Sequence, residues 1–422
     1  MASVTMNATA QRYVTARRQR VMGILFLGMA FGIWIFFGRG VPAGEVTTFG
    51  LAPGGAQVER LDWELPALAT LNTLAIVSAV LGGAQLARGF GRQTNWVLAL
   101  VAGFFIFSFL TWAAAGKSLN LVGLLNTTLS KSVPITLGAL SMVRRPPGCI
   151  LYPALHSTVL AGAMMGSLVA SLADNLWIGV LAAVATGALL ALVHAIFSIK
   201  YRIDQIISGT VINIFATGIT SYISAKFLQE YQELNNPGTF KAWAVPGLSE
   251  IPFIGPILFD NNMFVYAMFA FLIILHVALF YTRWGLRLRS VGEHPRAADT
   301  LGINVYRTRY MAVILGGMMA GFGGAYFTLG SVGRFDEVMT AGRGFIGLAA
   351  MIFGNWTPFG SFGAGLLFGF ADSLAARLAI LGVQIPSQFL LMAPYVATMV
   401  VLAGIVGRGH MPAADGQPYV KE

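Results

Sequence analysis

Charged side chains are scarce in this sequence of 422 residues. They make up 10% of it, whereas soluble proteins carry roughly 25%. A soluble protein of this length could not cover its surface with so few charges. Apolar residues reach 56%, 50 glycines add to them, and the mean hydropathy is +0.71. These values exclude a soluble protein and predict an all-α polytopic membrane protein.

Cysteine is nearly absent, and the histidines are not clustered. The single Cys149 excludes an intrachain disulfide and a cysteine-based metal site. The five histidines lack the H-x-x-x-H and H-E-x-x-H spacings, so we expect no metal site in this chain. Only Asp372 lies well inside an apolar run, whereas membrane enzymes and proton-coupled carriers use paired acids or relays. A membrane enzyme is therefore the least favoured function.

The net charge of +10 does not indicate a nucleic-acid partner. The basic residues lie at the ends of apolar runs, and they form no basic stretch interleaved with aromatic residues. We therefore expect membrane lipid, and no nucleic acid, to surround the chain. Orientation in the membrane explains the positive charge better than nucleic-acid binding does.

Twelve apolar runs approach the roughly 20 residues that a spanning helix needs. They cover 21–38, 67–87, 96–115, 119–143, 151–172, 177–199, 206–228, 262–282, 310–330, 340–354, 359–381 and 386–407. The tenth is short, which suggests a broken or re-entrant helix. Gly317 with Gly321, and Gly365 with Gly369, have the spacing at which small residues let helices approach closely, so we expect them to pack helices.

The charges of the loops predict the orientation. Basic residues fall in alternate loops, with Arg88 and Arg92, Arg144 and Arg145, Lys200 and Arg202, and six arginines within 283–309. Acids dominate the loops between them. This is the positive-inside pattern, and it predicts a cytoplasmic N-terminus and C-terminus. Arg334 and Arg343 are the main exceptions. Residues 1–43 could alternatively be a cleaved secretory signal, which would leave the later spans in the same orientation.

Two nucleotide-binding motifs are matched only superficially. Gly342–Gly347 fits G-x-G-x-x-G, but no βαβ unit surrounds it. Ala115–Ser118 resembles the end of a P-loop, yet Thr111 occupies the position of its first glycine. We therefore expect this chain to bind no cofactor and no ATP of its own.

Polar residues follow one face of the run 206–228. They recur every three or four positions, at Thr210, Asn213, Thr217, Thr220 or Ser221, and Ser224. Such a stripe forms hydrogen bonds between helices or lines a path for a polar solute. The sequence leaves both interpretations open.

Four other polar residues within the runs are candidates for the same path. Lys131 lies near the middle of 119–143, where a lysine costs roughly 2.5–3.5 kcal/mol on insertion scales unless it meets a partner or water. Asp372 is a conceivable partner, for which Arg377 competes. His156 is either a satisfied structural histidine or a solute contact. Gln388 and Tyr395 are seven residues apart on one face of the last run, and they meet a solute or a neighbouring helix.

The cytoplasmic loop 283–309 contains a short predicted helix. Pro295 favours a helix start and Gly302 a stop, so the sequence predicts a helix over 296–301. Ala297, Ala298 and Leu301 would give this helix a small apolar face. Physical chemistry alone does not decide whether it only connects two spans or docks in a groove of another protein.

Four segments closely resemble the permease subunits of nucleoside and simple-sugar ABC importers, which belong to the ribose and branched-chain amino acid permease superfamily. They read GLRLRSVGEHPRAADTLGINVYRTRYMAVILGGMMAGFGGAYFTLG from Gly285, MTAGRGFIGLAAMIFGNWTPFG from Met339, FGFADSL from Phe368 and PSQFLLMAPYVATMVVLAG from Pro386. The resemblance runs from about residue 119 to the C-terminus. It implies an N-terminal extension over 1–118 with about three spans, a permease core of roughly nine spans over 119–407, and a cytoplasmic tail over 408–422.

The resemblance also implies partners and a coupling loop at 283–309. Such importers combine two permease subunits, which are paralogues or a homodimer, with cytoplasmic ATP-binding cassettes that bind ATP and Mg and with an extracytoplasmic solute-binding protein. By resemblance, the residues that touch the cassette are Glu293, His294, Pro295, Arg296, Ala297, Ala298, Asp299 and Leu301.

The segment 144–157 departs from the family pattern. Such permeases usually carry S-E-R-x-G and then N-I-G-x-E-G, whereas here only Gly148 matches. Tyr152 replaces the asparagine and His156 replaces the glutamate, so the roles of those two family residues do not transfer. Both remain candidates for the solute path, because a tyrosine ring can stack on a base and histidine hydrogen-bonds in both protonation states.

The residues and the resemblance together favour a permease subunit of an ABC importer in a prokaryotic plasma membrane. It would provide the path for a nucleoside or a related simple-sugar solute. The alternative is a self-sufficient secondary transporter or channel for a small polar solute, which would need no cassette.

Overall fold

The computed structural model describes residues 16–52, 62–142 and 154–383, together with Pro386, Gln388, Phe389, Met392 and Tyr419. The chain divides into two compact units. The first comprises Met1–Gly123 with Arg377–Gln384, and the second comprises Leu124–Ala376 with Ile385–Glu422. The predicted boundary at residues 118 and 119 lies close to this division.

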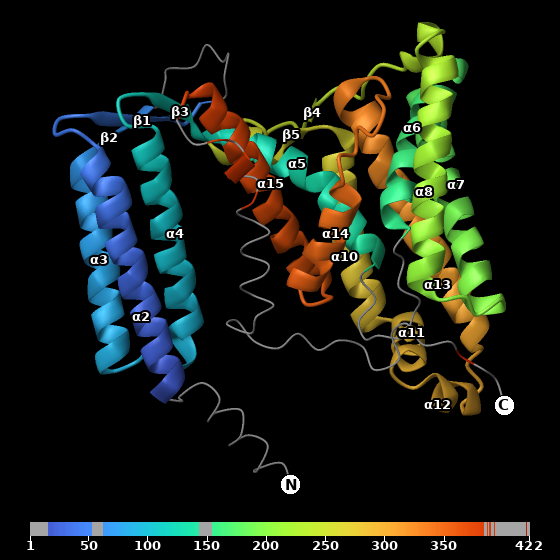
Figure 1. Cartoon of the computed structure of the whole chain (residues 1–422), viewed down its shortest axis with the longest axis horizontal. Coiled ribbons are helices and arrows are strands. Elements are labelled where there is room, and N and C mark those ends of the chain that lie inside the picture. The colour runs from blue at the N-terminus through green and yellow to red at the C-terminus, as the bar shows by residue number, and fades with distance from the viewer. Residues whose placement is uncertain are drawn as a thin grey trace. The chain divides into compact units, whose positions relative to one another are not determined.

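Three long helices form most of the first unit (Figure 1). They are α2 (Ala16–Gly32), which continues through short helical turns to Gly40, α3 (Ala67–Ala87) and α4 (Thr94–Ala113). Glycines bring α2 and α3 together. A Cβ added at Gly23 would lie 2.5 Å from the Leu86 side chain, and one at Gly82 would lie 2.9 Å from Leu27. Larger residues at these two positions would force the helices apart.

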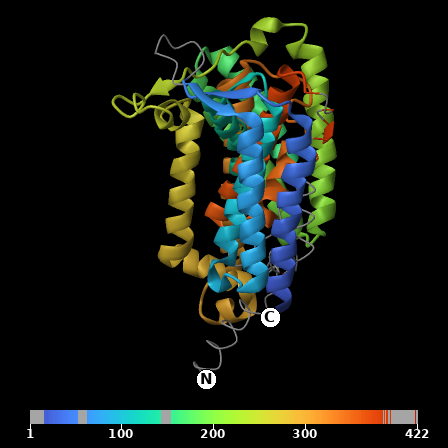
Figure 2. The same ribbon diagram turned by 90° about the vertical axis from the view of Figure 1, so that its left-hand side faces the viewer.

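A small sheet lies across one end of these helices (Figure 2). Strand β1 (Val46–Gly50) pairs antiparallel with β2 (Asp62–Pro66) and parallel with β3 (Ser118–Asn120). Phe49 on β1 is fully buried and stacks on Phe107 of α4 at 5.4 Å. The sequence did not predict these strands, because they are short and lie between apolar runs.

The second unit is almost entirely helical. Its main helices are most of α5 (Leu121–Met142), α6 (Leu155–Ala173), α7 (Leu176–Ala195), α8 (Gln205–Ile223), α10 (Met263–Tyr281), α11 (Arg283–Glu293), α12 (Pro295–Thr300), α13 (Val305–Ala325), α14 (Arg343–Phe353) and most of α15 (Pro358–Ile380). Helical turns of different pitch extend α7 to Lys200, α8 to Leu228 and α13 to Val332. The remaining elements are a short turn of helix, η6 (Gln232–Asn235), helix α9 (Ile254–Leu258) and two paired two-residue strands, β4 (Trp243–Ala244) and β5 (Asp260–Asn261).

Glycines hold α6, α7 and α13 in close backbone contact. A Cβ at Gly162 of α6 would lie 2.9 Å from the Gly321 backbone, and one at Gly187 of α7 would lie 2.9 Å from the same glycine. A Cβ at Gly317 would meet the Gly187 carbonyl. Gly369 of α15 likewise faces α5, since a Cβ added to it would lie 2.7 Å from the Thr128 carbonyl oxygen. The expectation that these glycines pack helices is confirmed.

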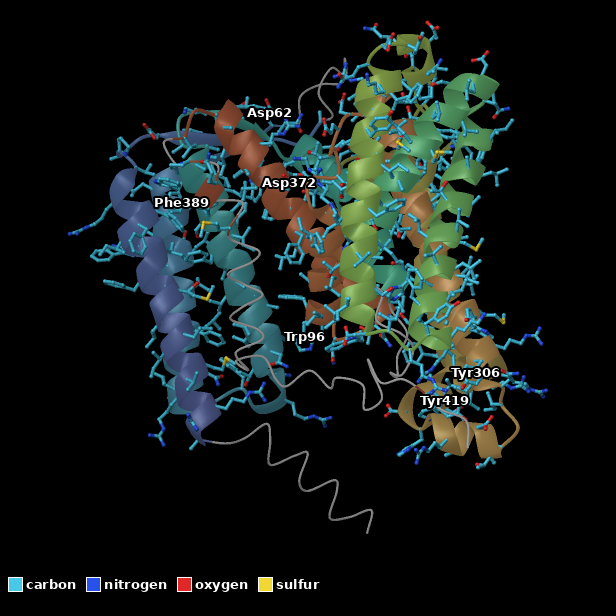
Figure 3. All side chains as sticks on the ribbon, turned by 45° about the vertical axis from the view of Figure 1, so that its right-hand side comes forward. Asp62, Trp96, Tyr306, Asp372, Phe389 and Tyr419 are labelled. Atoms are coloured by element: carbon cyan, nitrogen blue, oxygen red, sulfur yellow. The ribbon has the colours of Figure 1, made fainter. Side chains whose placement is uncertain are left out.

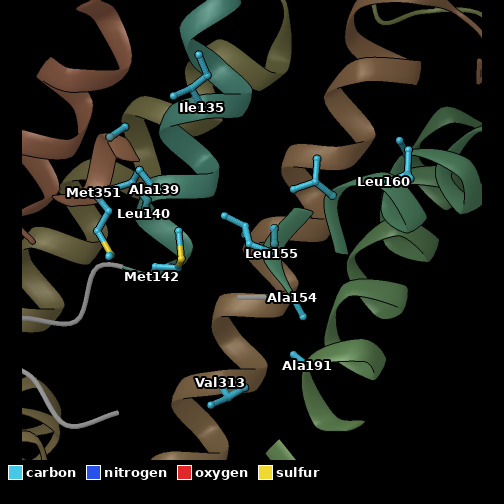
Figure 4. Close-up of a cluster of buried hydrophobic side chains, with 14 of the residues drawn as sticks. Ile135, Ala139, Leu140, Met142, Ala154, Leu155, Leu160, Ala191, Val313 and Met351 are labelled. Atoms are coloured by element: carbon cyan, nitrogen blue, oxygen red, sulfur yellow. The ribbon is translucent and has the colours of Figure 1, made fainter. Parts of the chain in front are cut away.

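The core of the second unit lies where these helices meet. Figure 4 shows Ile135, Ala139, Leu140 and Met142 of α5 and Met351 of α14, with side chains from α6, α7 and α13 in the same cluster. Leu140 and Leu155 are at most 2% exposed. This packing holds α14 between α5 and α6, and it therefore determines where the first turn of α14 lies relative to both helices.

Among the described residues, nine helices are long and apolar enough to cross a membrane. They coincide with nine of the predicted runs. The run 119–143 forms the 22-residue helix α5, which falls outside this group because it carries Asn126, Lys131 and several hydroxyl residues. The run 340–354 forms only the 11-residue helix α14, as its length suggested. The last run, 386–407, lies largely outside the described residues, so the count of twelve spans stays a prediction.

Candidate functional site

Helix α14 is too short to cross a membrane. Its 11 residues extend about 16 Å, roughly half of a 30 Å hydrocarbon layer. It begins after Gly342, whose φ of 76° is a left-handed conformation that suits glycine. In transporters, such interrupted helices place their N-terminal ends near the solute. The first turn of α14, Arg343–Ile346, is therefore the centre of the candidate site.

A cluster of three charges lies on one side of this turn. The Oδ2 atom of Asp372 on α15 is 3.4 Å from Lys131 Nζ on α5 and 3.1 Å from an Arg343 Nη atom on α14. Lys131 also donates a hydrogen bond of 3.1 Å to the backbone oxygen of Asp372. The close approach of α5 and α15 at Gly369 brings these side chains within reach. We call Lys131, Arg343 and Asp372 the charge cluster.

The charge cluster is only partly buried. The side chains of Lys131, Asp372 and Arg343 are 29%, 25% and 28% exposed. The Arg343 guanidinium also lies 5.8 Å from the Phe327 ring centroid, a distance that permits a cation–π contact. Asp372 is thus confirmed as the partner of Lys131. The expected competitor Arg377 is wrong, because Arg343 occupies that place. Arg377 follows Asp372 by five residues on the same helix, so the two side chains are turned about 140° apart.

His156 lies on the other side of the same turn. It is 8% exposed, and its ring stacks on Phe345 at 4.8 Å with an interplanar angle of 21°. A Cβ at Gly344 would lie 2.5 Å from the Cα of His156, so the backbones of α14 and α6 touch here. Its Nδ1 atom has no hydrogen-bond partner among the described residues. The first turn of α14 therefore separates the charge cluster from His156.

The polar stripe of α8 lies along the edge of the buried face of that helix. Asn213 and Thr217 are half-buried and Thr210 is exposed, whereas Thr220 and Ser224 are buried. The threonine hydroxyls donate to carbonyls of their own helix, as Thr217 does to Asn213 at 2.8 Å. Asn213 reaches α6, where its Oδ1 accepts from the Ser157 backbone N–H at 3.0 Å. The stripe therefore joins the site through Asn213, next to His156.

The remaining path candidates are not brought to this turn in the described structure. Gln388 is helical and exposed, and its side chain makes no hydrogen bond to the other residues that the structure describes. Tyr152 and Tyr395 lie outside the described residues. Sequence reasoning missed Arg343 and Phe345. The role of Arg343 could have been predicted. It is an exception to the charge pattern of the loops and needs an acidic partner, and Asp372 is the only acid well inside an apolar run.

A polar cavity of about 630 Å³ lies at the ends of α8 and α13 that the charge pattern assigns to the outside. Carboxamides and carboxylates, among them Gln229, Glu233 and Asn236, line it. At its rim Arg334 pairs with Asp336 at 3.1 Å, and both side chains are about half exposed or more. An exposed pair of this kind contributes at most about 1 kcal/mol. The pairing of Arg334 with Asp336, and of Arg343 with Asp372, explains the two exceptions to the positive-inside pattern.

The predicted short helix of the loop 283–309 is present as α12, with Pro295 at its first turn and Gly302 at φ 79° just after it. Its apolar residues do not share one face, contrary to the expectation. Ala298 is 1% exposed, whereas Ala297 is exposed and Leu301 is 80% exposed. In a helix, Ala297 and Leu301 are four residues apart and align, whereas Ala298 is turned by about 100°. Ala297 and Leu301 are thus available to a partner.

Tyr419 from the C-terminal tail covers the inner side of α12. It packs with Val291, Ala298 and Val305, and its ring lies 5.5 Å from that of Tyr306. Figure 3 shows the two tyrosines next to each other. Burial among these residues raises the pKa of Tyr419, and a hydrogen bond with Asp299 raises it further. The phenol therefore stays neutral to a higher pH than a free tyrosine, whose pKa is about 10. The stabilisation by this contact is fully present below that value and is lost as the pH rises through the raised pKa.

Comparison with known proteins gives a match whose range includes His156, Arg343 and Asp372. Residues 154–407 match a family described as the permease component of branched-chain amino acid transport systems. A guanosine ABC transporter permease of Bacillus subtilis (strain 168) is 43% identical over 248 residues, which cover 58% of this chain and 78% of the relative. A nucleoside ABC transporter permease of Lactococcus lactis subsp. cremoris (strain MG1363) is 45% identical with the same coverage.

A third relative is more distant but is matched along nearly its whole length. A putative glucose ABC transporter permease of Haloferax volcanii is 28% identical over 327 residues, which cover 71% of this chain and 98% of the relative. No solved structure matches the chain.

Proposed function

The chain belongs to the family of permease components of branched-chain amino acid transport systems, and we propose that it forms the path for nucleosides through an ABC importer. The observation that carries this proposal is the identity of 43% and 45% to permeases named for guanosine and nucleosides. The matched family region includes α14 and α15 of the charge cluster, along with His156 and α12. The chain is a multi-pass membrane protein and a transport subunit, and ATP hydrolysis belongs to another subunit.

The proposed path begins at the polar cavity and passes the first turn of α14. The cavity lies at the ends of α8 and α13, and η6 borders it. From there a solute would pass the first turn of α14, which has the charge cluster on one side and His156, next to Asn213, on the other. Lys131, His156, Thr210, Asn213, Thr217 and Gln388 are the described candidates that we retain for contacts along this path. These groups offer both donors and acceptors, as the base and the sugar of a nucleoside require.

The proposed partners follow from the family. Exposed Ala297 and Leu301 on α12 would touch an ATP-binding cassette, which supplies ATP and Mg. A second permease subunit would complete the path, and an extracytoplasmic binding protein would deliver the solute. The acidic outer loops and basic inner loops support the placement of both termini in the cytoplasm. The relatives from Bacillus subtilis and Lactococcus lactis support a prokaryotic plasma membrane.

Uptake measurements test the function directly. We would express the chain with its cassette, second permease and binding protein in a bacterium that lacks nucleoside uptake, and measure entry of radiolabelled guanosine. We expect uptake that stops when the cassette loses its ATP-binding lysine. Uptake that persists without the cassette would favour a secondary transporter, and no uptake of any nucleoside by the complete set would contradict the proposal.

A further inference from the structure

The charge cluster carries one more positive than negative charge. Among the described residues, Asp372 is the only acid within 4.0 Å of Lys131 or Arg343. A cluster built only to neutralise charge within the membrane would balance its charges, since each unpaired charge there is costly. An excess charge is tolerated where water reaches it, and each of the three side chains is about one quarter exposed. The cluster therefore has the charge and the exposure expected of residues that line a water-filled pathway.

The carboxylate of Asp372 is approached mainly through one of its two oxygens. The ion-pair distances of both cations are to Oδ2, and among the described residues no hydrogen bond to Oδ1 is seen. Arg343 has five N–H donors and Lys131 has three, of which the cluster uses only some. The cluster thus presents a charged acceptor next to charged donors. The neighbouring pair of His156 and Phe345 provides neither a charged acceptor nor a charged donor, because it consists of two stacked rings.

We propose that the charge cluster binds the vicinal hydroxyl groups of a ribose ring. Each hydroxyl both donates and accepts. One can donate to Oδ1 of Asp372 while its neighbour accepts from a spare N–H of Arg343 or Lys131. An acidic side chain recognises ribose hydroxyls in the same way in dinucleotide-binding folds. This inference rests on the proposed function and assigns the selection of ribonucleosides over deoxyribonucleosides to the membrane subunit.

The test compares uptake of guanosine with uptake of 2′-deoxyguanosine by the complete importer. The ratio of their uptake efficiencies is measured for the wild type, for Asp372→Asn, and for the double variant Asp372→Asn/Arg343→Gln. The double variant keeps the net charge of the cluster at +1, so it controls for misfolding caused by two unpaired cations. The binding protein is the same throughout, so any change in the ratio comes from the permease.

We expect the ratio to fall about tenfold or more in both variants, because a hydrogen bond to a charged group is lost only for the ribose substrate. Asp62→Asn is the matched control. It removes an exposed carboxylate on β2 of the first unit, which is no part of the proposed path, and should leave the ratio unchanged.

The outcomes separate this inference from the proposed function. Guanosine uptake with an unchanged ratio in the double variant would overturn the ribose site and leave the importer function standing. An equal fall for both nucleosides would also overturn it, because the cluster would then act without regard to the 2′-hydroxyl. If the wild type takes up no nucleoside, both proposals fail.

Discussion

At the scale of single residues, Lys131 decides between two interpretations that the sequence left open. Ion pairing with Asp372 is confirmed, and a role in the solute path stays a prediction. Removing the lysine distinguishes the two interpretations. Arg343 would still neutralise Asp372, so a loss of transport would come from the solute path and not from an unpaired carboxylate.

We expect Lys131→Met to reach the membrane in at least wild-type amounts. The substitution removes a side chain that costs roughly 2.5–3.5 kcal/mol at the centre of a membrane helix, and it leaves a balanced ion pair. Nucleoside uptake should nevertheless fall at least tenfold if the ammonium faces the solute. Quantitative immunoblotting of the membranes measures the amount of the variant, and nucleoside uptake by the same cells measures its transport. Wild-type uptake would show that Lys131 serves only as an ion-pair partner.

Tyr419 is a residue whose importance no sequence pattern indicated. It is more than a hundred residues along the sequence from the residues it contacts. A single tyrosine in a polar tail also forms no repeating pattern from which packing could be predicted. Its ring fills the space between α11, α12 and the start of α13, and the Arg309 guanidinium lies 5.9 Å from it. Tyr419 therefore supports α12 from the side opposite to a partner.

Removing this support should loosen α12 without changing the surface that α12 offers. We expect Tyr419→Ala to lower the number of nucleosides imported per ATP hydrolysed several-fold. Tyr419→Phe keeps the ring and loses only the hydrogen bond with Asp299, so it should behave nearly as the wild type. Paired uptake and hydrolysis assays in proteoliposomes measure the ratio. Equal ratios in all three proteins would mean that the contact does not support coupling.

At the scale of elements, the sequence predicted what periodicity and turn residues control. Pro295 and Gly302 predicted α12 to within one residue at each end, and the glycine pairs predicted close helix packing. The faces of α12 were predicted wrongly, because Tyr419 covers Ala298. The partner of Lys131 was predicted, but Arg343 was not, since its position depends on the tertiary placement of α14.

The exposed side of α12 leads to a prediction about coupling. Leu301 is 80% exposed, a large apolar side chain that a partner groove would accommodate. Leu301→Asp should insert normally and bind the cassette weakly, so that solute no longer stimulates ATP hydrolysis. Leu286→Asp is the matched control, because Leu286 is a 60% exposed leucine on the neighbouring helix α11. Normal cassette binding and uptake by Leu301→Asp would contradict the proposed contact.

At the scale of the whole molecule, composition predicted the class of protein, because lipid constrains composition strongly. The orientation that the loop charges predict stays a prediction. The small sheet of the first unit was not predicted, since no such constraint acts on loops. The Haloferax volcanii relative matches 71% of this chain but 98% of its own, so about three tenths of this chain has no counterpart there.

The orientation can be tested in intact cells with single cysteines. Cys149 is first replaced by serine, and a cysteine is then introduced at exposed Glu233 or at exposed Thr300. The acidic loop that contains Glu233 should face outward, and the basic loop that contains Thr300 should face the cytoplasm. A membrane-impermeant thiol reagent should therefore label position 233 in intact cells, and position 300 only after the cells are opened. The reverse pattern would place α12 outside, where no cassette could reach it, and would remove the basis for the coupling proposal.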